Sequence, residues 1–114
     1  MKRLTGRIAV VTGAGSGIGR ATSLALAERG CSIAVVDVQS DGAEGTADLV
    51  RSLGAPASVH VADVRDAKRM GELPSEVEGS LGSCQILVNN AGVTAAGAFA
   101  DETVEDLRWI VDIN

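Results

Sequence analysis

Apolar residues in this chain form short continuous runs that alternate with longer stretches of helical spacing. The short runs are rich in β-branched residues, which predicts strands buried on both faces. Four such strands are expected, at Ile8–Val11, Cys31–Val36, Ser58–Ala62 and Gln85–Val88. Between and after them, apolar residues recur every three or four positions. This spacing predicts helices over Ser16–Arg29, Asp41–Leu53, Asp66–Leu81 and Thr103–Asn114.

The order strand–helix, repeated four times, predicts an α/β fold. Such alternation is typical of a parallel sheet that carries helices on both faces and has right-handed crossovers. The expected strand order is 3-2-1-4, that of a doubly wound sheet which stops after the fourth strand and the helix that follows it. The sequence contains no linker, so we expect one domain and no second one.

Two of the predicted helices contain residues that weaken helices. Gly42 and Gly45 lie early in the second helix and leave its start uncertain. Pro74 lies inside the third, where proline removes a hydrogen bond and clashes with the preceding turn, at a cost of about 3 kcal/mol. We therefore expect a kinked or broken helix over residues 66–81.

The segment between the first strand and the first helix has the features of an anion-binding site. Glycines let the backbone approach a phosphate, and the free N–H groups and dipole of a helix N-terminus favour negative charge. A plain tight turn is the alternative, but the strand–glycine–helix context is that of a dinucleotide site. The expected cofactor-binding residues of this turn are Gly13, Gly15, Ser16, Gly17, Ile18 and Gly19.

Asp37 ends the second strand. A carboxylate at this place accepts hydrogen bonds from a ribose diol and repels a 2′-phosphate. No Arg or Lys lies in the glycine turn or directly after Asp37. The sequence therefore favours NAD over NADP, the alternative being a solvated acidic residue at a strand end.

The spacing Thr-Gly-x-x-x-Gly-x-Gly from Thr12, together with Asn-Asn-Ala-Gly at 89–92, resembles the short-chain dehydrogenase/reductase family. The resemblance implies a Rossmann-type fold and an NAD-dependent oxidoreductase that moves a hydride between a nicotinamide cofactor and an alcohol or ketone. It covers the whole chain but not the whole family pattern, because the chain stops at Asn114. We therefore expect residues 1–114 to be an incomplete dinucleotide-binding domain, the N-terminal fragment of such an enzyme.

The same resemblance assigns roles to residues after the third and fourth strands. Asp63 and Val64 match residues that contact the adenine ring in the family, although a strand-end Asp is often only a turn residue or a helix cap. Asn90, Ala91 and Gly92 match a segment that lines the adenosine ribose, the alternative being an Asn/Gly turn. Ligands of open α/β sheets bind at the carboxyl ends of strands, which is where all these residues are expected.

Asn114 lies on the apolar face of the last predicted helix and matches the helix asparagine of the family's catalytic set, which helps to hold a water in a proton relay. The family's other catalytic groups are a Ser and a Tyr-x-x-x-Lys pair further along. This sequence has no Tyr, and its lysines, Lys2 and Lys68, belong to no such motif. We expect the chain alone to be unable to transfer a hydride.

Composition and charge limit the possible partners. The net charge of −5 without a basic cluster argues against nucleic acid. No stretch approaches the ~20 apolar residues of a membrane span, which favours a cytoplasmic protein without a membrane partner. Cys31 and Cys84 are expected to be small buried hydrophobic residues, and His60 has no ligand spacing near it, so no metal site is expected.

Two other functions fit the same residues. One is a catalytically silent NAD-binding module, and the other is a partner-dependent subunit. The fourth strand lies at the edge of the expected sheet, and an unpaired edge favours association or oligomerisation.

Overall fold

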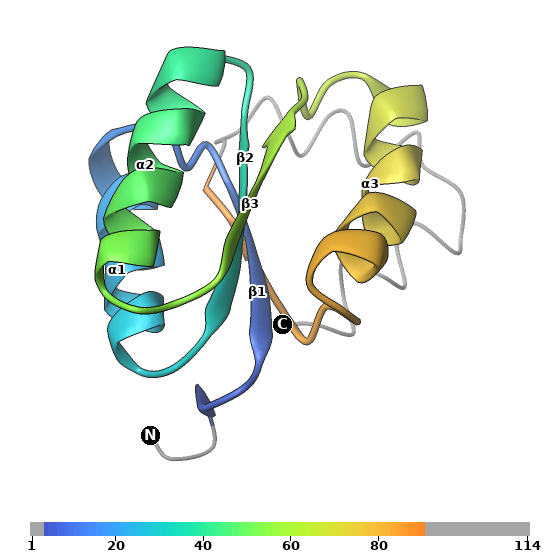
Figure 1. Ribbon diagram of the computed structural model, residues 1–114. Coiled ribbons are helices and arrows are strands. Elements are labelled where there is room, and N and C mark those ends of the chain that lie inside the picture. Colours follow the sequence, from blue (N-terminus) through green and yellow to red (C-terminus); the bar gives the residue numbers. More distant parts are fainter. Residues whose placement is uncertain (1–3, 91–114) are drawn as a thin grey trace.

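The structure, a computed structural model, describes residues 4–90. These residues form β1 (Ile8–Thr12), α1 (Gly17–Glu28), β2 (Ser32–Asp37), α2 (Ser40–Ser52), β3 (Ala57–Val61), α3 (Ala67–Ser80) and β4 (Ile86–Asn89). The strands are parallel and lie in the order β3-β2-β1-β4, which confirms the predicted sheet. Figure 1 shows α1 and α2 on one face of this sheet and α3 on the other. The helix expected over 103–114 lies outside the described residues.

The core consists of two apolar layers, one on each face of the sheet. Successive strand residues point to opposite faces, so Ala9 and Val11 pack under α1 and α2 while Val10 packs under α3. Each of these three β1 side chains has no exposed surface. Both faces of the central strand are therefore covered, as the continuous apolar run of β1 predicts.

Of the two expected outcomes at Pro74, a kink or a break, the break is wrong, because α3 is continuous from Ala67 to Ser80. Leu73 and Val77, on either side of the proline, are fully buried. Burial of such side chains is worth about 1.5–3 kcal/mol each, which offsets the cost of an interior proline. The Asp66 carboxylate also caps the helix, accepting a hydrogen bond from the Arg69 N–H at 3.1 Å.

Two arginine side chains donate hydrogen bonds to carbonyl groups of β3, the strand at one edge of the sheet. Arg51 from the end of α2 donates to the Ala57 carbonyl at 3.0 Å, and Arg69 from α3 donates to the Val61 carbonyl at 3.2 Å. Arg69 is itself paired with Glu76, whose carboxylate also contacts the ring of the buried His60 at 3.0 Å. Edge carbonyls that would be open to another strand are thus already bonded.

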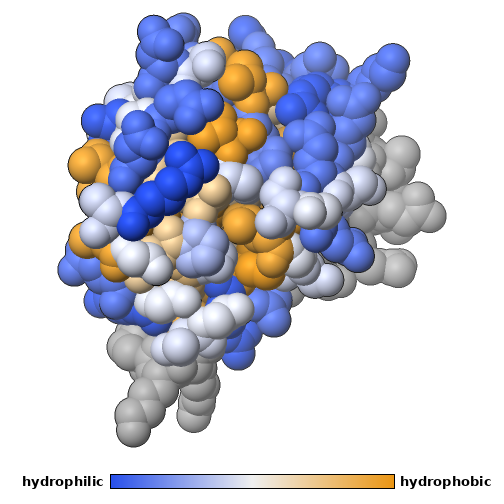
Figure 2. Space-filling view, in the orientation of Figure 1, coloured by the Kyte–Doolittle hydropathy of each residue, from blue (hydrophilic) through white to orange (hydrophobic). Residues whose placement is uncertain are grey.

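Figure 2 shows the apolar surface of one face broken into separate patches among hydrophilic residues. Scattered apolar side chains are ordinary on a protein surface. Among the described residues, the exposed large apolar side chains are Ile18, Val38, Leu49, Leu53 and Val61.

Candidate functional site

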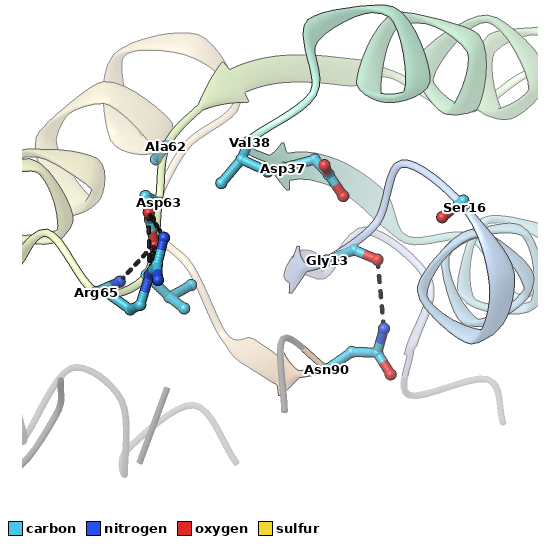
Figure 3. Close-up of a pocket in the computed structure, with 9 residues that line it drawn as sticks. Gly13, Ser16, Asp37, Val38, Ala62, Asp63, Arg65 and Asn90 are labelled. Atoms are coloured by element: carbon cyan, nitrogen blue, oxygen red, sulfur yellow. Dashed lines mark hydrogen bonds and ion pairs between the residues drawn. The ribbon is translucent and has the colours of Figure 1, made fainter. Parts of the chain in front are cut away.

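A cleft of about 400 Å³ lies at the carboxyl ends of the strands. Its lining residues come from the segments that follow each of the four strands (Figure 3), which is where open α/β sheets bind ligands. They are Gly13, Ser16, Asp37, Val38, Ala62, Asp63, Val64, Arg65 and Asn90. Six of these were predicted as cofactor-binding residues, namely Gly13, Ser16, Asp37, Asp63, Val64 and Asn90. The predicted residues Ala91, Gly92 and Asn114 lie outside the described residues.

The glycine turn joins β1 to the N-terminus of α1. Gly13 and Gly17 have φ values of 62° and 54°, a left-handed conformation that favours glycine. Ser16 is the N-cap of α1, but its side chain makes no capping hydrogen bond. The first N–H groups of the helix therefore remain available to an anion beside the cleft.

The other predicted residues of the turn lie outside the cleft lining. A Cβ at Gly19 would lie 2.1 Å from the Gly13 carbonyl oxygen, so glycine is needed there for α1 to approach the turn. Ile18, in the first turn of α1, is 75% exposed. An apolar side chain held in solvent at a helix N-terminus is available for contact with a ligand.

Asp37 connects the end of β2 to the glycine turn. Its Oδ2 accepts a hydrogen bond from the Gly15 N–H at 2.8 Å, and its Oδ1 accepts one from the Gln39 N–H at 2.9 Å. A carboxylate has about four acceptor positions, so each oxygen can accept a further bond from a ligand. A Cβ at Gly15 would lie 2.9 Å from the Asp37 carboxyl carbon, which explains the glycine.

The end of β4 is joined to β1 by side chains. The Thr12 hydroxyl, which is fully buried, lies 3.2 Å from the Asn89 side-chain oxygen and accepts from the Asn90 N–H at 3.0 Å. The Asn90 side-chain amide donates to the Gly13 carbonyl at 3.3 Å. Asn90 therefore holds the glycine turn while it lines the cleft.

Asp63 is paired with Arg65, a cleft residue that the sequence reasoning missed. The Arg65 backbone N–H and Nε lie 2.9 and 3.0 Å from Asp63 Oδ1, and its Nη2 lies 2.7 Å from Oδ2. These hydrogen bonds lower the pKa of Asp63 to about 2. Asp63 is thus a carboxylate at neutral pH, and among the described residues that line the cleft Arg65 is the only basic one.

Arg20 and Thr46, also missed by the sequence reasoning, hold the glycine turn on the side of α2. The Thr46 hydroxyl donates to the Ala14 carbonyl at 2.7 Å and accepts from Arg20 Nε at 2.8 Å. Arg20 Nη2 donates to the carbonyls of Gly15 and Gly42 at 2.9 and 3.2 Å.

The two glycines of α2 make these contacts possible. A Cβ at Gly42 would lie 2.8 Å from the Gly15 oxygen, and one at Gly45 would lie 3.0 Å from Arg20 Nη2. Two small residues one helical turn apart, followed by a hydroxyl, are the signal in the sequence that α2 packs closely against the turn.

Among residues 4–90, no group of His, Cys, Asp and Glu side chains is placed to hold a metal ion, and no helix is both long and apolar enough to cross a membrane. Cys31 and Cys84 are free thiols. Burial raises the pKa of both, that of Cys84 to about 11, so neither is a thiolate nucleophile at neutral pH.

Comparison with known proteins agrees with this geometry. The probable oxidoreductase EphD of Mycobacterium tuberculosis is 38% identical over 104 residues, which are 91% of this chain and 18% of the relative. A short chain dehydrogenase from Mycobacterium paratuberculosis, solved with NAD, is 34% identical with a TM-score of 0.74, over 96% of this chain and 45% of that one. NAD+-bound xylitol dehydrogenase is 31% identical with a TM-score of 0.77, over 98% of this chain and 44% of that one.

The chain spans less than half the length of these relatives. Each comparison, however, covers more than nine-tenths of this chain. The sequence profile of the family described as short chain dehydrogenase matches residues 7–114, which include the glycine turn and Asp37. This chain therefore belongs to the short-chain dehydrogenase family of oxidoreductases.

Proposed function

We propose that this chain is the NAD-binding part of a dehydrogenase that transfers a hydride between NAD and an alcohol or ketone. The observation that carries the proposal is the position of Asp37, which holds the glycine turn while it lines the cleft. A bound nicotinamide would supply the hydride donor or acceptor. The N-terminus of α1 would hold the pyrophosphate, and Asp37 would accept hydrogen bonds from the adenosine ribose.

The remaining residues complete the proposed cofactor site. Asp63 and Val64 would contact the adenine, and Asn90 with Ala91 and Gly92 would line the ribose. Asn114 would have a supporting catalytic role, and the chain alone would be inactive. We include in the proposal a cytoplasmic location and association through the edge strand β4.

A preference for NAD over NADP follows from charge. Asp37 is negative and faces the part of the cleft where a 2′-phosphate would lie, so the two groups would repel. Arg65, which could attract such a phosphate, is already paired with Asp63 through three of its nitrogens. Both features favour an unphosphorylated ribose.

Titration of the native protein with NADH and NADPH tests the proposal. We expect tighter binding of NADH, and Asp37→Asn should reduce this preference because it removes the negative charge but keeps an oxygen that can accept from the Gly15 N–H. Glu44→Gln makes the same charge change on an exposed residue of α2 and should leave the preference intact. Equal affinities in the wild type, or an Asp37→Asn variant with unchanged preference, would refute the assignment.

Turnover separates the enzyme from a silent NAD-binding module. The same cleft supports both, so the protein isolated from its source should be assayed for NAD reduction with a panel of secondary alcohols, beside residues 1–114 alone, which should be inactive. A measurable rate from the isolated protein supports the dehydrogenase, whereas NADH binding without any turnover in that protein supports the module.

A further inference from the structure

Two carbonyl groups of the glycine turn, those of Ala14 and Gly15, are held on the side of α2. Thr46 binds the Ala14 carbonyl and Arg20 binds the Gly15 carbonyl, while the Gly15 N–H is bound by Asp37. Thr46 is fully buried, and both of its hydroxyl bonds are shorter than 3.0 Å. Three side chains from α1, α2 and the end of β2 thus fix two consecutive peptide units.

The direction of the Gly15 carbonyl decides the direction of the next N–H. A trans peptide is planar, so its C=O and N–H point in opposite directions, and the described residues contain no cis peptide. Because Arg20 holds the Gly15 oxygen toward α2, the Ser16 N–H points the other way. Ser16 lines the cleft, so an N–H directed away from α2 at this residue can reach an anion bound there.

We propose that Arg20 is a positioning residue for the phosphate subsite, acting through the Gly15–Ser16 peptide and not by contact with the phosphate. The inference rests on the proposed NAD-binding function. The Arg20 guanidinium already donates to three acceptors of the protein, Thr46 Oγ1 and the carbonyls of Gly15 and Gly42. Its bonds come from Nε and Nη2, two nitrogens of one planar fork, a geometry that the ammonium of lysine does not reproduce.

The proposal predicts a loss of affinity that depends on phosphate. Arg20→Ala should weaken the binding of NADH and ADP about tenfold, the effect of one lost charge-assisted hydrogen bond, and should leave adenosine binding unchanged. Thr46→Val should also weaken the binding of NADH and ADP, although it alters no charge. Thr46→Ser keeps the hydroxyl and should bind both ligands as the wild type does. Isothermal titration calorimetry of the native protein with the three ligands gives the dissociation constants.

Two controls separate this role from others. Arg29→Ala removes the same charge from the exposed end of α1 and should leave all three affinities unchanged. Among the described residues, the Arg29 guanidinium bonds only to the Ala25 carbonyl of its own helix. In the ligand-free protein, Arg20→Ala should also speed amide exchange at Gly15, since one of the three side chains that fix these peptide units is lost.

The possible results are distinct. An equal loss for adenosine and ADP would show a general structural defect and overturn the proposal. A full effect of Arg20→Ala with none of Thr46→Val would point to direct contact between Arg20 and phosphate, and would overturn it as well. A wild type that binds neither NADH nor ADP would refute the proposed function, and exchange at Gly15 would then decide whether Arg20 holds the turn.

Discussion

Replacing Gly42 with alanine should destabilise this protein, although alanine favours helices more than glycine does. The new Cβ would lie 2.8 Å from the Gly15 carbonyl oxygen and 3.3 Å from Gly15 Cα. These are backbone atoms that cannot rotate away, and Arg20 and Asp37 hold that backbone in place. Overpacking of this kind costs about 1–3 kcal/mol, which outweighs a gain in helix propensity of at most about 1 kcal/mol.

Gly79 provides a matched control for this substitution. It lies in α3, and a Cβ there would meet no heavy atom within 4 Å. Gly79→Ala should therefore raise the free energy of unfolding by about 0.5–1 kcal/mol. Urea titration of the two variants and the wild type gives the comparison, and NADH titration should show weaker binding for Gly42→Ala alone. If Gly42→Ala is stabilised as much as Gly79→Ala, the close packing of α2 on the glycine turn is not a constraint.

Two further predictions concern charged side chains of the segment before α3 and its cap. Because pairing with Arg65 lowers the folded pKa of Asp63 from 3.8 to about 2, the pair stabilises the fold above pH 4, and this contribution is lost as the pH falls through 2. Arg65→Gln should raise the pKa of Asp63 toward 3.8 in an NMR titration, and an unchanged value would show that the pair does not form. Asp66→Ala should cost about 1 kcal/mol of unfolding free energy because it removes the cap of α3. Ser16→Ala should cost less in the same urea titration, since Ser16 makes no side-chain cap bond, and equal costs would contradict this.

The order of elements was predictable because it depends on local periodicity. Each strand is a short apolar run that needs cover on both faces, and the sequence shows this directly. The break at Pro74 was wrongly predicted for the opposite reason. The cost of an interior proline is local, whereas the burial of Leu73 and Val77 against the sheet that offsets it appears only in the folded structure.

Some features of the candidate site could likewise be predicted from the sequence and others could not. Asp37 and the glycine turn were predictable from their positions, because strand ends and helix starts determine where a ligand meets the sheet. The bond between Asp37 and Gly15 and the contacts of Arg20 with α2 depend on distances between segments far apart in the chain. The two α2 glycines followed by Thr46 mark a close approach but do not name the partner segment, so in the sequence they appeared only as weak points of a helix.

The arginines on β3 have a consequence for solubility. Arg51 and Arg69 are bonded to carbonyl groups that would otherwise be a template for strand addition by another molecule. Neither side chain lines the cleft. Loss of either one would therefore lower the yield of soluble protein through aggregation while leaving the nucleotide site of the remaining molecules intact.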